Sequence, residues 1–398
     1  MVKYLIALIL ILLNRPSTAQ PTITLRIDPD NSRGGPASQI FDSLEFIPLQ
    51  TTNESLFGTV DQLEVTDSLF IILDVRSHSI LLFHRNGKFY TKITTGGANK
   101  YFYYFTLDRS AGEIVATNNY ANGLLVFDLQ GKFLRKERCP DNVMSIYRFS
   151  DGLTLYNIRR SAHCISSAPT LYDLCYTKNY DSLIRNLKPY NAGNEDDEYN
   201  MISNPINFSG EDGSCMFSMP FDHTFYQFND TGLIRKYHFI FPLIYSLPAN
   251  FATDAAYCNL RGKYAYTTPG NESVITALER GYSEGEYLLF STFSRRITSF
   301  NVGYNYAYNL RTGSLISFSR VTADSSSCYF PILSTPLELI GAVYRGNVFS
   351  SVPSFKLFAI KNSLDKKVTY SKSLQEYLST GKRTDNAVII QFKLKPGL

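Results

Sequence analysis

Short apolar runs separated by turn residues follow one another from about residue 40 to the end of the chain, and two stretches repeat clearly. Ser79 to Phe89 aligns with Gly123 to Phe133 at an offset of 44 residues. The alignment extends upstream, where residues 70–72 lie over residues 114–116. Each copy has the pattern strand, loop, strand, glycine turn, strand, which predicts a β-meander with tight hairpins.

Fainter copies of the same hairpin follow at Leu171 to Ile184, Phe225 to Ile234 and Tyr306 to Leu315. A repeat of this length with four short strands per unit is typical of a β-propeller, because one blade cannot bury both of its faces without neighbours. The 359 residues from Ile40 to Leu398 would hold about eight units of 44 residues. The later units are longer, however, so six or seven blades fit equally well.

The first residues have the pattern of a secretory signal peptide. Lys3 supplies a positive charge, Tyr4 to Leu13 form an apolar run of ten residues, and Ser17-Thr18-Ala19 is a small-residue cleavage site. As a helix this run would rise only about 15 Å, roughly half of a bilayer core, so a membrane anchor is disfavoured. We therefore expect cleavage near Ala19, an N-terminal extension over residues 20–39, and a propeller domain over residues 40–398.

The C-terminal region predicts one short helix and the strand that closes the ring. Ser373 and Glu376 have the spacing of a capping box, and Gly381 is a suitable stop. The strongly apolar strand that follows, residues 386–393, is expected to pair with an N-terminal strand near residues 44–49.

Composition excludes some classes of protein. The chain has 28 Tyr, 28 Phe and no Trp, which favours β-structure, and its formal charge of +4 without a basic block argues against nucleic-acid binding. No later apolar run is long enough to span a bilayer, so no membrane span is expected in the mature chain. The six cysteines allow fifteen pairings. Cys164 and Cys175 close a short loop and are the first candidates for a disulfide in an exported protein.

The chain resembles a family of exported six-bladed β-propellers from Bacteroidetes, related to the TolB-like and NHL-repeat propellers. The resemblance rests on residues 40–51 and 56–58, on the first blade at residues 69–74 and 80–89, and on the closing strand at residues 384–395. It implies six blades and export, but it carries over no catalytic residue. The sequence departs from the family at residues 96–101, where an acidic turn usually stands.

The residues that could serve in catalysis or ligand binding have mostly structural interpretations. No G-x-S-x-G elbow, zinc-type histidine pair or phosphate loop is present. Asp74 and Asn118 occupy the same place in two repeats, which favours a turn-fixing role. The acidic run 195–198 could attract a cation but fits a solvated loop better. The tyrosine-rich segments 101–104 and 304–308 could contact a sugar or protein, or pack between blades.

The sequence therefore predicts an all-β fold, a six-bladed β-propeller with four-stranded blades and a short C-terminal helix. We expect a periplasmic or secreted monomer that acts as a binding or interaction module. Its partner would be a protein or a glycan, bound over the axial mouth or on one loop-bearing face. No catalytic or metal-binding residue is assigned, no cofactor is expected, and the sequence does not identify the ligand-binding residues. The alternative is a Ca²⁺-dependent, lactonase-like hydrolase or lyase with an axial metal site.

Overall fold

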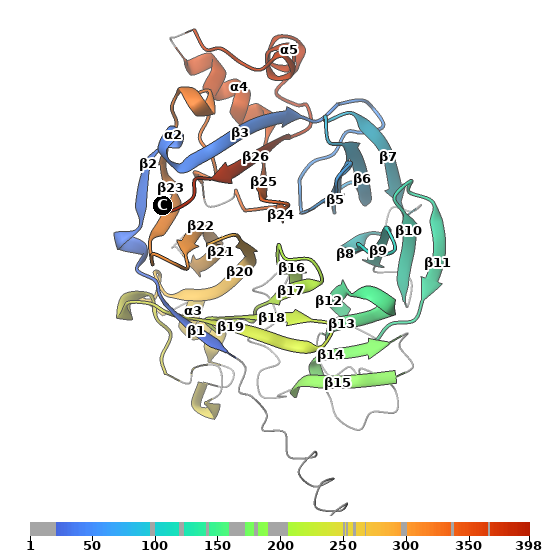
Figure 1. Ribbon diagram of the computed structural model, residues 1–398, viewed down its shortest axis with the longest axis vertical. Coiled ribbons are helices and arrows are strands. Elements are labelled where there is room, and N and C mark those ends of the chain that lie inside the picture. The colour runs from blue at the N-terminus through green and yellow to red at the C-terminus, as the bar shows by residue number, and fades with distance from the viewer. Residues whose placement is uncertain are drawn as a thin grey trace, which may run out of the picture.

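The computed structural model describes residues 21–398 except 96–99, 119–122, 141–142, 159–171, 179–181, 190–205, 250, 252–253, 258–259, 267, 296–300, 336–337 and 365–366. Within this part of the chain the strands form six sheets of four or five strands each. The sheets stand around a common axis as the blades of a propeller (Figure 1). The predicted fold class and blade number are confirmed.

Blades 1 to 3 are antiparallel meanders in chain order, with the first strand innermost. Blade 1 consists of β4 (Gln62–Val65), β5 (Leu69–Asp74), β6 (Ser79–His84) and β7 (Phe89–Thr94). Blade 2 consists of β8 (Phe102–Asp108), β9 (Glu113–Asn118), β10 (Leu124–Asp128) and β11 (Phe133–Glu137). Blade 3 consists of β12 (Val143–Arg148), β13 (Leu153–Ile158), β14 (Tyr172–Lys178) and β15 (Ser182–Pro189). The 44-residue repeat thus corresponds to blades 1 and 2.

Blades 4 and 5 each gain a fifth strand from the N-terminal segment. Blade 4 consists of β16 (Ile206–Phe208), β17 (Ser214–Phe217), β18 (Thr224–Asn229) and β19 (Gly232–Ile240), and β1 (Thr22–Arg26) pairs with β19 in parallel. Blade 5 consists of β20 (Ile275–Glu284), β21 (Tyr287–Arg295), β22 (Asn301–Asn309) and β23 (Leu315–Thr322), and β2 (Arg33–Pro36) pairs with β23 in parallel. The segment expected to be an extension therefore covers the outer edges of two blades.

Blade 6 joins the two ends of the chain. It consists of β24 (Ala342–Tyr344), β25 (Asn347–Val352), β26 (Val388–Leu394) and β3 (Phe41–Pro48). The C-terminal strand β26 pairs antiparallel with the N-terminal strand β3, and Ile390 lies opposite Phe46. The predicted closure of the ring by these two segments is confirmed.

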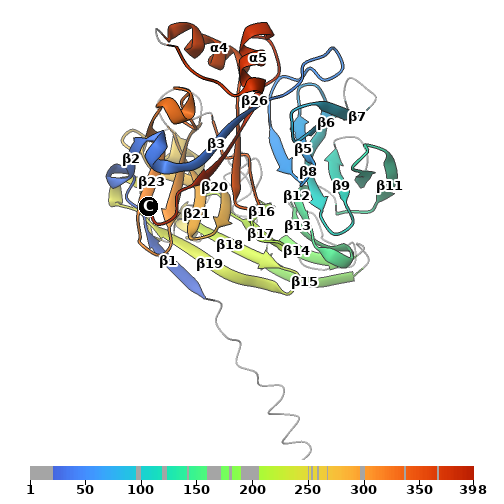
Figure 2. The ribbon, with the colours of Figure 1, turned by 45° about the horizontal axis from the view of Figure 1, so that its top comes forward.

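In the described part of the chain, helices are few and lie outside the ring. They are α2 (Ala37–Ile40), α3 (Arg261–Tyr266), α4 (Ser354–Ser363) and α5 (Lys372–Thr380), with short 3₁₀ turns at Pro29–Asn31, Ser150–Gly152, Leu243–Tyr245, Ala255–Tyr257 and Ser325–Ser327. Helices α4 and α5 stand beyond β3 and β26 (Figure 2). The predicted capping box at Ser373 was wrong: the side chain of Ser371 accepts the hydrogen bond from the Leu374 amide. The predicted stop at Gly381 is confirmed.

The core lies between neighbouring blades. Between blades 6 and 1, for example, Phe70 and Ile72 of β5 pack against Phe349 of β25 and Ile389 of β26. The Phe70 and Phe349 rings meet edge to face at 5.9 Å between centroids. Because every sheet buries both faces in this way, the second and third strands are nearly continuous apolar runs, which is why their repeat is visible in the sequence.

One buried side chain ties the last strand to the segment that leads into blade 1. Asn386 is 1% exposed, its carboxamide oxygen accepts from the Phe57 amide at 3.1 Å, and its Nδ2 donates to the Gln50 and Ser55 carbonyls, each at 2.9 Å. A single substitution would leave three backbone groups without partners.

We expect Asn386→Ala to lower the free energy of unfolding by about 2–3 kcal/mol, because buried polar groups that lose their partners retain their desolvation cost. Chemical denaturation of the purified protein measures this. Asn53→Ala is the matched control, since Asn53 is exposed nearby and its side chain makes no hydrogen bond with the described residues. Equal stability of the two variants would contradict the assigned role.

Candidate functional site

A cavity of about 840 Å³ opens at one mouth of the ring. It lies among the turns that join the first and second strands of blades 1, 2, 3, 4 and 6, and we call this end of the ring the hairpin face. Because these turns carry polar and charged residues from separate parts of the sequence, the cavity exists only once the ring has closed.

Arg109, in the turn after β8, is the central cation of the cavity. Its guanidinium donates from Nη2 to Glu64 Oε2 at 2.8 Å and from Nη1 to the Val65 carbonyl at 3.0 Å, both in blade 1. The same group lies 4.2 Å from the ring centroid of Phe208 and 5.2 Å from that of Tyr344. Burial raises the pKa of Glu64, and the charge of Arg109 opposes that rise.

Two buried tyrosines lie next to this ion pair. The Tyr104 hydroxyl donates to the Ile206 carbonyl at 2.8 Å, which links the inner strands of blades 2 and 4. The Tyr282 hydroxyl donates to the Gly341 carbonyl at 3.0 Å, which links blades 5 and 6. Burial raises the pKa of both tyrosines, so both stay protonated and act as donors. These side chains fix the inner strands relative to one another.

The rim between blades 1 and 6 is an ion pair. Arg345 Nη1 lies 2.6 Å from Asp67 Oδ1, and the Tyr344 hydroxyl donates to the same oxygen at 3.1 Å. Both charged side chains are well exposed, at 71% for Arg345 and 60% for Asp67. An exposed pair of this kind contributes little stability and can exchange partners with a ligand.

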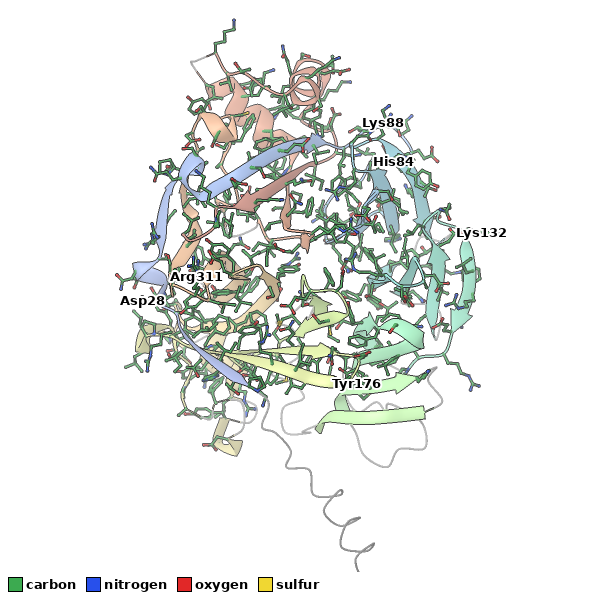
Figure 3. The ribbon with its side chains drawn as sticks, viewed as in Figure 1. Asp28, His84, Lys88, Lys132, Tyr176 and Arg311 are labelled. Atoms are coloured by element: carbon green, nitrogen blue, oxygen red, sulfur yellow. The ribbon has the colours of Figure 1, made fainter. Side chains whose placement is uncertain are left out.

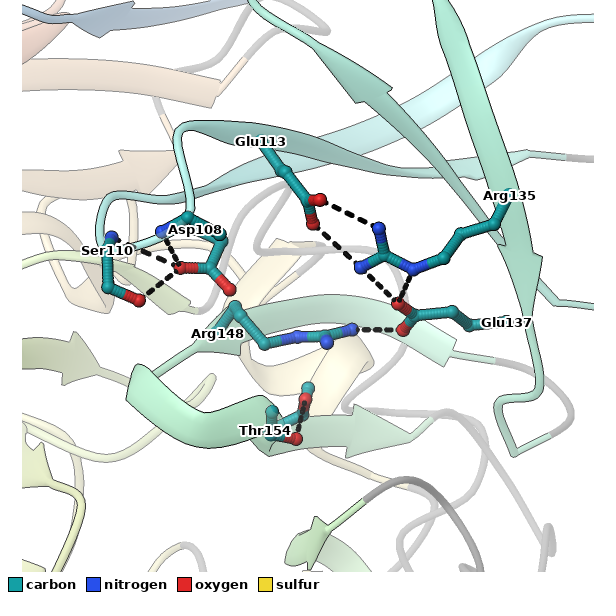
Figure 4. Close-up of polar contacts among 9 residues, drawn as sticks. Asp108, Ser110, Glu113, Arg135, Glu137, Arg148 and Thr154 are labelled. Atoms are coloured by element: carbon teal, nitrogen blue, oxygen red, sulfur yellow. Dashed lines mark hydrogen bonds and ion pairs between the residues drawn. The ribbon is translucent and has the colours of Figure 1, made fainter.

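The wall between blades 2 and 3 is a chain of charges (Figure 4). Arg135 binds Glu113 through two hydrogen bonds of 2.7 Å, and Glu137 bridges Arg135 to Arg148. Burial raises the pKa of Glu137, but the two guanidiniums more than offset this, so the pKa lies below its ordinary value. Glu137 therefore stays ionised at neutral pH and pairs with both guanidiniums. In the adjacent turn, Asp108 accepts from the amide and hydroxyl of Ser110.

The lining carries an excess of negative charge. Six carboxylates and three guanidiniums line the cavity: Asp67, Asp108, Glu113, Glu211, Asp212, Asp230, Arg109, Arg148 and Arg345. Each of the three guanidiniums already pairs with a carboxylate. Asp212 and Asp230 are exposed, and within the described part of the chain neither carboxylate accepts a hydrogen bond. The cavity therefore offers negative charge to a ligand.

The repeated polar residues have the structural role that the sequence predicted. Asp74 is fully buried, and its carboxylate accepts from the Gly58 and Arg76 amides at 2.8 and 3.2 Å. Asn118 donates from Nδ2 to the Gly123 carbonyl at 3.3 Å. Both side chains fix loops between strands and lie outside the lining of the cavity.

The cysteine pair and the acidic run lie wholly or partly outside the described residues, and two histidines lie outside the lining of the cavity. Cys175 is disulfide-bonded, but Cys164 lies outside the described residues, so their pairing stays a prediction. The acidic run 195–198 also lies outside the described residues. His84 lies beside the β6–β7 turn at the perimeter, close to Lys88 (Figure 3). His223 shares a hydrogen bond with the Ile275 carbonyl, and burial lowers the pKa of its imidazole.

Sequence reasoning missed the charged residues of the hairpin face. Asp67 and Asp212 lie in the turn before the second strand of a blade, and Arg345 takes the same place in blade 6. Asp108 is the last residue of β8, directly before such a turn. Once the second strands at residues 70–72 and 114–116 were aligned, the residues a few positions upstream could have been compared. This comparison of upstream residues would have identified polar turns, but not the cavity that they form.

Two further findings concern metals and membranes. Among the described residues, no three His, Cys, Asp or Glu side chains are grouped so that they could hold a metal ion. In the same part of the chain, no helix is both long and apolar enough to cross a membrane.

Fold and site together define a six-bladed β-propeller with a charged cavity at one axial mouth. The chain belongs to the family described as domain of unknown function DUF4934, whose sequence model matches residues 21–393. No curated protein matches the chain.

Three solved structures are similar to this chain, and one of them supports the fold. A Bacteroides fragilis protein described as exported is similar at 16% identity and a TM-score of 0.67, over 94% of this chain and 99% of that one. A DUF4221 family member from Bacteroides vulgatus has 10% identity and a TM-score of 0.45, over 89% and 97% of the two chains. A Bacteroides thetaiotaomicron protein of unknown function has 9% identity and a TM-score of 0.43, over 92% and 75%. Only the first has a TM-score above 0.5, and at 16% identity it supports the fold alone. The matched family and these three structures do not confirm a TolB-like or NHL-repeat propeller.

Proposed function

We propose that this protein is an exported binding module that holds a lysine- or arginine-bearing segment of a partner protein in the cavity of the hairpin face. The observation that carries the proposal is the excess of carboxylates over guanidiniums in a cavity of about 840 Å³. A cleft lined by one sign of charge concentrates ligands of the opposite sign and orients them on approach.

The distribution of charge supports a basic ligand. The whole chain has a formal charge of +4, so the negative cavity is a local feature and does not reflect the average composition. The carboxylates Asp212 and Asp230 need no rearrangement to accept a cation. Asp67 could exchange Arg345 for a cationic side chain at small cost, because their ion pair is exposed.

Two observations support export. Residues 1–19 have the pattern of a cleaved signal peptide, and the Bacteroides fragilis protein of similar fold is described as exported. We place the mature protein in the periplasm or outside the cell. There the hairpin face would be available to other exported or envelope proteins.

The test is the binding of a fluorescein-labelled hexalysine peptide, followed by fluorescence anisotropy at low and physiological salt. We expect saturable binding that weakens with salt, and about tenfold weaker binding to the double variant Asp212→Asn/Asp230→Asn, because two exposed charge pairs are lost.

The control is the double variant Asp42→Asn/Glu54→Gln, which removes two exposed carboxylates elsewhere on the molecule. It should bind hexalysine as the unsubstituted protein does. A hexaglutamate peptide should bind neither this control variant nor the unsubstituted protein. Equal weakening in both double variants would show that the peptide senses only the overall charge and would overturn the proposal.

A further inference from the structure

A second hollow, of about 230 Å³, lies in the wedge between blades 4 and 5. One face of the blade 5 sheet forms its floor, with Thr292 on β21, Tyr304 and Tyr306 on β22, and Ser317 on β23. Asp30 of the N-terminal segment and Tyr245 line it as well. None of these residues lines the cavity of the hairpin face.

The unusual length of the blade 5 strands creates this hollow. Strands β20, β21 and β22 have 10, 9 and 9 residues, whereas the corresponding strands of blade 1 have 4, 6 and 6. The apolar contact with blade 4 is made by Phe290, which packs on Phe239 at 4.8 Å between ring centroids. Beyond that contact the extended strands present hydroxyl groups and tyrosines. The extension therefore adds a polar surface that the ring itself does not need.

Hydrogen bonds hold the polar groups of the hollow in place. The Tyr245 hydroxyl donates to Asp30 Oδ1 at 2.7 Å. Arg320 Nη1 donates to the Asp30 and Ser32 carbonyls at 2.9 and 2.7 Å, which fixes the N-terminal segment over the sheet. The Gly270 amide donates to one carboxylate oxygen of Glu272, at 3.1 Å. Tyrosine rings, hydroxyls and two carboxylates thus surround one small space, already oriented.

This set of groups matches a neutral sugar. Tyrosine combines an apolar ring, which packs on the C–H face of a pyranose, with a hydroxyl that can donate or accept. Carboxylates accept hydrogen bonds from sugar hydroxyls, and the serine and threonine hydroxyls can bond in either direction. Two carboxylates against the single guanidinium of Arg320 disfavour an anionic sugar. The volume lies below the roughly 300–1,000 Å³ of drug-sized sites, so it suits one sugar unit.

We infer that the wedge between blades 4 and 5 is a carbohydrate subsite that binds one neutral sugar unit of a glycan. This inference is independent of the proposed binding of a basic segment at the hairpin face, because the two sites share no residue. It also gives a function to Tyr304 and Tyr306, which the sequence marked as a sugar or protein contact or as interblade packing. Tyr306 does both, since it belongs to the apolar cluster that Phe239 of blade 4 and Phe290 of blade 5 form between the blades, and it also lines the hollow.

The test is saturation-transfer difference NMR of the mature chain with the methyl glycosides of glucose, galactose, mannose and N-acetylglucosamine, each alone, and with glucuronate. We expect transfer to at least one neutral glycoside and none to glucuronate. Ser319→Tyr should abolish the transfer, because Ser319 is exposed at the edge of the hollow and the added ring would fill it. Glu272→Gln, which keeps the shape and removes a charge, should weaken binding about threefold or more.

The matched control is Ser379→Tyr, the same substitution at an exposed position on α5, and it should bind as the unsubstituted protein does. The double variant Asp212→Asn/Asp230→Asn should also show saturation transfer to the neutral glycoside. This result separates the sugar site from the cavity of the hairpin face. No transfer to any of the four glycosides, transfer that survives Ser319→Tyr, or equal transfer to glucuronate would each overturn the inference.

Discussion

Removal of residues 386–398 should abolish cooperative unfolding of the propeller. The deletion removes β26, which lies between β25 and β3, so the N-terminal strand β3 loses its only partner strand among the described residues. Four fully or almost fully buried side chains are lost with it: Val388, Ile389, Ile390 and Phe392. At about 1.5–3 kcal/mol each, they match the entire 5–15 kcal/mol that stabilises a typical domain.

Thermal unfolding followed by circular dichroism measures this effect. The control is removal of residues 21–26, which deletes β1 at the outer edge of blade 4 and leaves the ring closed. That variant should keep a cooperative transition at a lower midpoint. A cooperative transition in the C-terminal truncation, at a midpoint close to that of the full chain, would contradict closure by β26.

Arg109→Met should lower the free energy of unfolding at pH 7 by about 3 kcal/mol, because it leaves the Glu64 carboxylate buried without its counter-charge. Glu64→Gln in the same chain should restore much of the loss, since a neutral amide is less costly to bury than a lone carboxylate. Removal of the stacking of Arg109 between Phe208 and Tyr344 should keep the recovery incomplete.

The loss should depend on pH in a definite direction. Burial raises the pKa of Glu64 in the folded state, and removal of Arg109 takes away the charge that opposes this rise. A raised carboxyl pKa means that stability is fully present below the unfolded pKa of about 4.3 and is lost as the pH rises through the folded value. Urea denaturation at pH 4.5 and pH 7 should therefore show the smaller deficit at pH 4.5. The same deficit at both pH values would contradict the pairing of Arg109 with a buried Glu64.

The hairpins of the blades could be identified from the sequence because their pattern is local. All five hairpin copies are the third and fourth strands of blades 1 to 5. The sixth copy is missing for a physical reason. In blade 6 the fourth strand is β3, which comes from the other end of the chain, so no hairpin joins it to β26. A search for hairpins finds five units in a ring of six.

Two sets of elements went unpredicted because packing decides them rather than sequence pattern. Helix α4 was not predicted, because its buried residues Leu357 and Phe358 are adjacent and Phe355 on the same helix is 55% exposed, so no apolar stripe marks it. The segment 20–39 is rich in polar residues, Gly and Pro, yet it supplies β1 and β2. Those strands form because the edges of β19 and β23 offer backbone partners, and backbone pairing needs no particular side chains.

The sequence by itself determined the blade repeat, the closing strand and the structural role of Asp74, because each depends on neighbours in the chain or on a strong apolar pattern. Only the tertiary structure decided which charges meet. Glu64, Arg109, Glu211 and Arg345 lie far apart in sequence and come from four blades, and the ring brings them to one mouth. Likewise Asp30 and Tyr245 meet over blade 5 only after the N-terminal segment has paired with the outer strands. Sites of this kind exist only in the closed ring, and the local sequence pattern does not show which residues the ring brings together.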